Sequence, residues 1–150
     1  MCNVVYLSTD GEEDLSIHNN ELVRFEKKQD LSADPALRLL TFPHRWYLGS
    51  KTGCSCTFRH WLGVNGSPCF GHPEDWYPED VDEIQATKIL YRVIENLLSF
   101  GHEVECLDSW NNEDLDAIQH MEVCLRRLPI EEFRLFEGYC FHFKAQTAAG

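Results

Sequence analysis

The feature that most constrains the fold is one amphipathic segment in the second half of the chain, PEDVDEIQATKILYRVIENLLSFGH. Asp80 is placed to cap the N-terminus of a helix, and Glu83, three residues later, completes the pattern of a capping box. Gly101 supplies the residue type that ends helices in the left-handed conformation. Between these signals, apolar side chains recur at helical spacing at Ala86, Leu90, Val93, Ile94 and Leu97. The sequence therefore predicts a helix over residues 81–99.

Runs rich in β-branched and aromatic residues lie on both sides of this helix and predict strands. The predicted strands are residues 3–9, 21–28, 44–49, 102–110, 120–128 and 138–144. Short helical turns are predicted within residues 32–40, 111–118 and 130–133. One helix among several strands, without two βαβ units, favours an α+β fold with a mostly antiparallel sheet packed on one long helix.

The apolar face of the helix also predicts what it covers. We expect Ala86, Leu90, Val93 and Leu97 to face the strands that carry Val5, Tyr47, Val104 and Phe141. In the last strand, side chains alternate, so that Tyr139, Phe141 and Phe143 share one face and Cys140 and His142 the other. No linker divides the chain, so we expect a single domain over residues 1–150, with residues 144–150 as a loose tail.

The charge balance narrows the class of partner. The chain has 25 acidic against 13 basic side chains, a formal net charge of −12. This charge repels phosphate backbones, and no Lys/Arg cluster offsets it locally, so we expect no nucleic acid partner. The sequence has no apolar run of membrane-spanning length and no signal-peptide pattern, so we expect no membrane partner and a cytoplasmic location. The expected partner is a protein or a small molecule.

Cysteine usage and one long loop indicate where chemistry would lie. The chain has seven cysteines, an odd number, and thiols in a cytoplasmic protein stay reduced. Such cysteines are either small buried side chains or ligands. Residues 50–78 contain several glycines and prolines but no sustained periodicity. A loop of this length in a compact domain is typically functional or internally tied.

Within this loop, four residues have the spacing C-x-C-x12-C-x2-H: Cys54, Cys56, Cys69 and His72. Zinc favours four thiolate or imidazole ligands, usually offered as two close pairs, so this spacing predicts a zinc site, with His60 as an alternative ligand. Two other interpretations stay open. The thiols and imidazoles are packing or surface residues, or Cys54 and Cys56 form a strained, reducible disulfide.

Aromatic residues of the same loop suggest a second kind of site. They are Trp61, Phe70, Trp76 and Tyr77. Aromatic side chains in a loop either plug the edge of the core or line a contact surface. No acid/base or nucleophile arrangement is recognisable, which favours a small acidic binding or interaction module with this surface. The alternative is a thiol- or zinc-dependent enzyme centred on Cys54 and Cys56.

The segment around the two thiols carries a family resemblance. Residues 46–56, WYLGSKTGCSC, follow the pattern aromatic-Tyr-x-Gly-Ser-x-x-Gly-Cys-x-Cys, and residues 133–143 are FRLFEGYCFHF. On these segments the chain resembles a family of small uncharacterised bacterial proteins. The resemblance covers most of the chain and implies no particular activity.

Overall fold

The structure is a computed structural model, and it describes residues 3–32, 34–61, 70–71, 79–110 and 115–144. A six-stranded sheet has the order β2-β3-β1-β5-β8-β6. Its strands are β1 (Asn3–Thr9), β2 (Val23–Lys28), β3 (His44–Ser50), β5 (Val104–Trp110), β6 (Gln119–Val123) and β8 (Tyr139–Phe143). All neighbours are antiparallel except β6 and β8, which run parallel. The α+β prediction with a mostly antiparallel sheet is confirmed.

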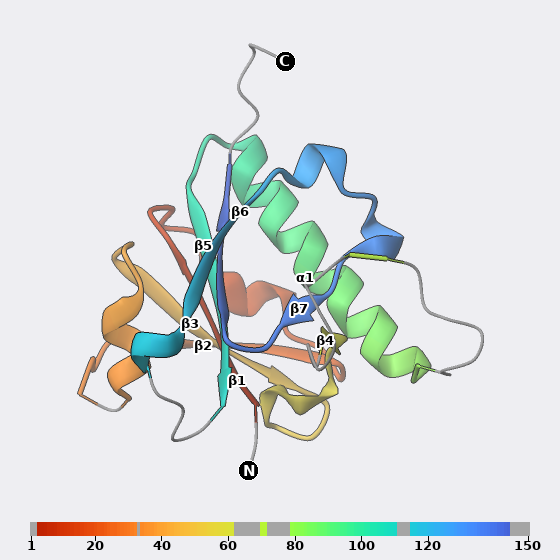
Figure 1. Ribbon diagram of the computed structural model, residues 1–150, viewed down its shortest axis with the longest axis horizontal. Coiled ribbons are helices and arrows are strands. Elements are labelled where there is room, and N and C mark those ends of the chain that lie inside the picture. The colour runs from red at the N-terminus through yellow and green to blue at the C-terminus, as the bar shows by residue number, and fades with distance from the viewer. Residues whose placement is uncertain (1–2, 33, 62–69, 72–78, 111–114, 145–150) are drawn as a thin grey trace.

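The one α-helix of the described residues, α1 (Val81–Ser99), has the predicted bounds and packs across one face of the sheet (Figure 1). The Asp80 side chain accepts a hydrogen bond from the backbone N–H of Asp82 at 2.8 Å. At the other end, Gly101 has φ +83°, and the N–H of His102 bonds back to the carbonyl of Leu97 at 3.1 Å. Asp80 therefore caps the N-terminus of the helix, and Gly101 ends it, as the sequence predicts.

Shorter elements complete the chain. The 3-10 turns are η1 (Leu15–His18), η2 (Pro35–Leu39), η3 (Ser55–Thr57), η4 (Leu115–Ala117), η5 (Leu125–Arg127) and η6 (Ile130–Glu132). Strands β4 (His60–Trp61) and β7 (Leu135–Phe136) pair in parallel as a separate ribbon. The prediction of one strand over residues 120–128 is wrong beyond Val123, because the chain turns there into η5, where the N–H of Arg127 bonds to the carbonyl of Cys124.

The main core lies between α1 and the sheet. The buried helix residues Ala86, Leu90, Val93, Ile94 and Leu97 belong to one cluster with Val5, Val104 and Phe141. The expectation that Tyr47 faces the helix is wrong: Trp46 and Leu48 join this cluster, and Tyr47 points to the opposite face. Both sets of alternating residues in β3 include large apolar side chains, so their pattern alone does not select the face.

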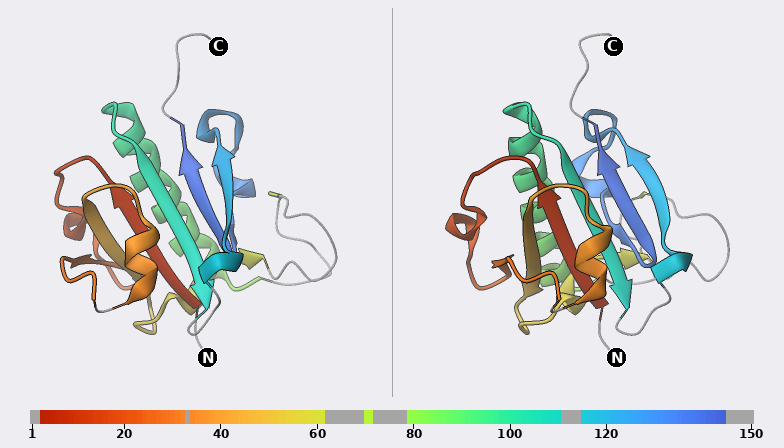
Figure 2. Two further views of the ribbon diagram at one scale, coloured as in Figure 1. Left: turned by 60° about the vertical axis from the view of Figure 1, so that its left-hand side comes forward. Right: turned by 90° about the vertical axis from the view of Figure 1, so that its left-hand side faces the viewer.

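The second face of the sheet is also covered at its centre. Ala36 and Leu37 of η2 pack on Tyr6 of β1, Leu107 of β5 and Cys140 of β8 in a smaller cluster. Figure 2 shows η2 and α1 on opposite sides of the sheet. The middle strands are therefore buried on both faces. None of the described helices is long and apolar enough to cross a membrane.

Leu90 tests the main core, because its side chain is fully buried under the sheet. Replacing Leu90 with Ala should lower the free energy of unfolding by about 2–5 kcal/mol, since it removes apolar contacts and leaves a cavity. Val81→Ala on the same helix is the control, since Val81 is 68% exposed and its truncation should change stability by less than about 0.5 kcal/mol. Urea unfolding measures both, and equal effects would contradict this packing.

Candidate functional site

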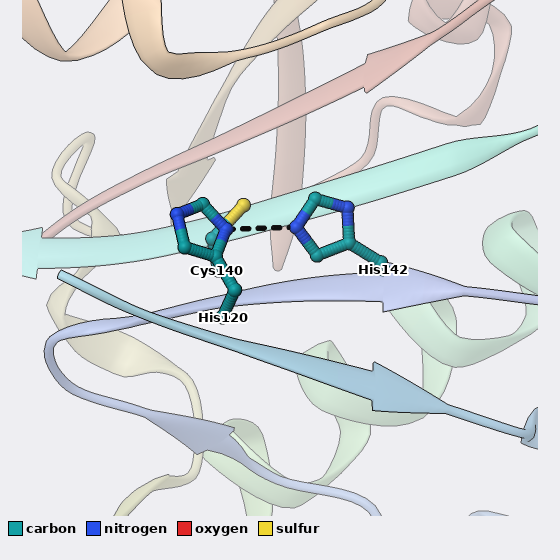
Figure 3. Close-up of side chains that lie close together, drawn as sticks. All are labelled: His120, Cys140 and His142. Carbon is teal, nitrogen blue, oxygen red and sulfur yellow. Dashed lines mark hydrogen bonds between the residues drawn. The ribbon is translucent and has the colours of Figure 1, made fainter.

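Three potential metal ligands meet on the sheet face opposite α1: His120 of β6 with Cys140 and His142 of β8 (Figure 3). Cys140 and His142 are two residues apart on one strand and so share a face. The parallel register places His120 directly beside Cys140. One donor atom from each of the three residues lies within 4.8 Å of the others. Thiolate and imidazole ligands of this kind are a donor set that zinc and copper accept.

The two imidazoles point their nitrogens at each other. His120 Nδ1 and His142 Nε2 are 2.8 Å apart, so one of them carries the hydrogen. The other nitrogen of His142, Nδ1, lies 3.1 Å from Oε2 of Glu105 on the neighbouring strand β5. An ionised carboxylate only accepts hydrogen bonds, so Nδ1–H of His142 donates to Glu105. The lone pair of His142 Nε2 then faces His120 and Cys140.

Glu105 is a buried carboxylate, with a side chain that is 1% exposed. Its Oε1 accepts hydrogen bonds from the hydroxyl of Ser8 at 2.8 Å and from the backbone N–H of Thr41 at 2.5 Å. Its Oε2 accepts a further bond from the Thr41 hydroxyl at 3.0 Å. These neutral donors satisfy the carboxylate without cancelling its charge. A carboxylate behind a histidine is a common outer partner of metal-binding imidazoles.

Cys140 is fully buried and, in the absence of a cation, stays protonated. Burial, and then the negative charge of Glu105, raise the pKa of its thiol to about 12. A thiol with so high a pKa is a poor nucleophile at neutral pH. A metal ion would supply the positive charge that the thiolate needs, because a coordinating thiol is deprotonated outright. The arrangement therefore supports ligation rather than nucleophilic catalysis.

The sequence contains part of this site. The period-2 pattern of residues 138–144 places Cys140 and His142 on one face, as the structure confirms. His120 could not be joined to them, because the parallel pairing of β6 with β8 is a long-range property of the fold. Glu105 was hidden for the same reason, since its contact with His142 depends on the β5–β8 register.

The predicted thiol pair lies elsewhere, at the turn that follows β3. Gly53 has φ +87° and closes this turn, in which the N–H of Ser50 bonds to the carbonyl of Cys54 at 2.8 Å. Cys54 and Cys56 are both half-buried and reduced, and the Thr52 hydroxyl lies 3.2 Å from the Cys54 sulfur. The other predicted ligands, Cys69 and His72, lie outside the described residues. The four-residue zinc site stays a prediction.

The alternative ligand His60 is engaged within the fold, and its side chain is 7% exposed. Its Nδ1 lies 2.7 Å from Oδ2 of Asp108, and its Nε2 lies 2.8 Å from the carbonyl oxygen of Ser55. Both partners are acceptors, so an imidazolium that donates from both nitrogens fits the site. As a metal ligand, His60 would have to give up one of these bonds.

Of the predicted aromatic surface, Phe70 is described, and it packs into the main core. Its ring lies 4.7 Å from that of Phe136 and 6.0 Å from that of Phe133, measured between centroids. Phe70 thus plugs the core edge. The side chain of Trp61 and the residues Trp76 and Tyr77 lie outside the described part, so a contact surface formed by them stays a prediction.

Comparison with known proteins adds no relative to this picture. No protein-family model, no curated protein and no solved structure matches the chain. The resemblance carried by residues 46–56 and 133–143 stays a prediction.

The pair of His60 and Asp108 makes stability depend on pH. Burial alone would lower the pKa of His60, but the hydrogen bond and charge of Asp108, the Ser55 carbonyl and the charge of Glu137 outweigh it, so the pKa is raised above 6.5. A raised pKa means that the charged His60 is stabilised in the folded protein, which adds to the free energy of unfolding. This stabilisation is fully present below the unfolded pKa of about 6.5 and is lost as pH rises through the folded pKa.

Urea unfolding between pH 5.5 and 9 should show this loss, and Asp108→Asn should flatten the dependence because it removes the main charge that raises the pKa. His44→Gln, a change in a half-buried histidine of β3, should leave the dependence in place. An unchanged slope in Asp108→Asn would show that the pair does not carry the effect.

Proposed function

We propose that this protein is a metal-binding module that holds a transition-metal ion of the zinc and copper class through His120, Cys140 and His142. The observation that carries the proposal is the close approach of three donor atoms within 4.8 Å of one another. Thiolate and imidazole ligands are typical of these metals, and the three residues stand on two neighbouring strands of a regular ladder. Such strands hold ligands more exactly than loops do.

The exposure of the ligands supports an ion at the surface rather than in the core. Cys140 is buried, the His142 side chain is 34% exposed, and His120 is exposed. An incoming ion therefore meets an imidazole first and the buried sulfur last. Zinc with three protein ligands takes water or another small ligand in its fourth position.

This proposal differs in place, not in cofactor class, from a zinc- or thiol-dependent site at Cys54 and Cys56. The predicted partners of the thiol pair at the β3 turn, Cys69 and His72, lie outside the described residues, and the alternative ligand His60 is engaged with Asp108 and Ser55. The strand site has its three donors together already. Variants of the two sites separate the two proposals.

Elemental analysis of protein purified without chelator tests the site. The wild type should contain about one equivalent of metal, and His120→Ala or Cys140→Ala should lose it because each removes one of only three protein ligands. His44→Ala and Cys124→Ala are matched controls for the loss of an imidazole and a thiol, and both should retain the metal. Cys124 is exposed at the end of β6.

The same experiment with Cys54→Ser/Cys56→Ser decides between the sites. Loss of metal in that variant, with full occupancy in His120→Ala, would overturn the proposal in favour of the β3 turn. As a second readout, zinc at 100 times its dissociation constant should raise the free energy of unfolding of the wild type by about 2.7 kcal/mol. His120→Ala should lack this increase.

A further inference from the structure

We infer that Glu105, which is not itself a ligand, determines the specificity of the centre: it presents the Nε2 lone pair of His142 and makes the site select a divalent over a monovalent ion. The inference rests on the proposed metal-binding function. It concerns a residue on β5, a different strand from those that carry the ligands. Its role is therefore one of positioning and charge.

The positioning follows from the hydrogen bonds of the carboxylate. Ser8 and Thr41 donate hydrogen bonds to the Glu105 carboxylate, and Nδ1 of His142, at 3.1 Å, is its further described donor. Because Glu105 accepts only, the hydrogen of a neutral His142 must sit on Nδ1. The Nε2 atom is then unprotonated and accepts a hydrogen bond from Nδ1–H of His120, a bond that a metal ion would replace after His120 moves this hydrogen to its Nε2.

The net charge of the metal-loaded site favours a divalent ion. A Cys140 thiolate and the Glu105 carboxylate each contribute one negative charge, and two neutral imidazoles contribute none. A divalent ion cancels both charges, whereas a monovalent ion such as Cu⁺ leaves a net negative charge beside a buried sulfur. An uncompensated charge in such surroundings is costly.

Two described cations near the site are bonded to groups other than Glu105: the guanidinium of Arg45 donates to the carbonyls of Leu37 and Leu40, and Lys144 pairs with Glu122. Among the described residues, His142 donates to Glu105, the Ser8 hydroxyl and the Thr41 backbone and hydroxyl supply neutral donors, and the charge of Glu105 also acts on the Cys140 thiol. The negative charge is therefore directed at the metal position through one imidazole ring. Because Coulomb energy scales with the charge of the ion, a divalent ion gains twice what a monovalent ion gains.

The positioning is tested on the metal-free wild type by the ¹⁵N and ¹H correlations of its histidine rings in NMR. We expect His142 to carry its hydrogen on Nδ1, and His120 to donate from Nδ1 as the matching partner. A hydrogen on Nε2 of His142 would overturn the inference. This measurement needs no variant, so it decides the positioning role even if a substitution at Glu105 prevents folding.

The selectivity is tested by competition titrations with Zn²⁺ and with Cu⁺ on Glu105→Gln. Loss of the carboxylate should weaken Zn²⁺ binding about 10–100-fold, as removal of an outer carboxylate typically does. Cu⁺ binding should weaken by only about the square root of that factor, about 3–10-fold, because its charge is half as large. The control is Glu26→Gln, which removes the same charge from an exposed site on β2, at the opposite edge of the sheet, and should change neither affinity by more than about twofold.

The outcomes separate this inference from the proposed function. Equal losses for Zn²⁺ and Cu⁺ in Glu105→Gln, or a change matched by Glu26→Gln, would overturn the specificity role while leaving the metal site intact. A wild type that binds neither ion would instead overturn the proposed function itself, whatever the tautomer of His142.

Discussion

Burial of the sheet on both faces is the constraint on which the rest of the structure depends. Helix α1 covers one face of the middle strands and η2 covers the other, so a polar side chain on these strands cannot reach bulk water from either side. Buried carboxylates persist in such surroundings only when hydrogen bonds or opposite charges satisfy them. Strand β5 carries two, Glu105 and Asp108, which are three residues apart and therefore point to opposite faces.

Each of these carboxylates is paired with a histidine, and the two pairs differ in what the second ring nitrogen meets. In His60 it meets the carbonyl of Ser55, so both ring nitrogens are hydrogen-bonded within the fold. In His142 it meets another imidazole, with a thiol alongside. Both carboxylates are buried, but the first pair is satisfied within the fold, whereas the second stands beside the three residues of the proposed metal site.

Much of the fold could be predicted from the sequence because local signals specify it. The caps at Asp80 and Gly101 and the 3.6-residue period fix α1, and period-2 runs fix most strands. The sequence could not predict which side chains of β3 face the helix, since Trp46, Tyr47 and Leu48 are all large and apolar. This site was not predicted, and the sequence placed only Cys140 and His142 on one strand face. The registers of β6 and β5 against β8 bring in His120 and Glu105 from 20 and 35 residues away in the sequence.

The position of the centre on the sheet also determines how the fold responds to the ion. Small zinc domains are unfolded without metal, because the ion replaces a core that they lack. Here strands β6 and β8 belong to a sheet whose main core contains Leu90, Val104 and Phe141 and none of the three proposed ligands. The site is therefore preorganised by packing that the metal does not supply. In the proposed function, the binding energy of an ion at His120, Cys140 and His142 would add to packing in which these ligands are not the main core.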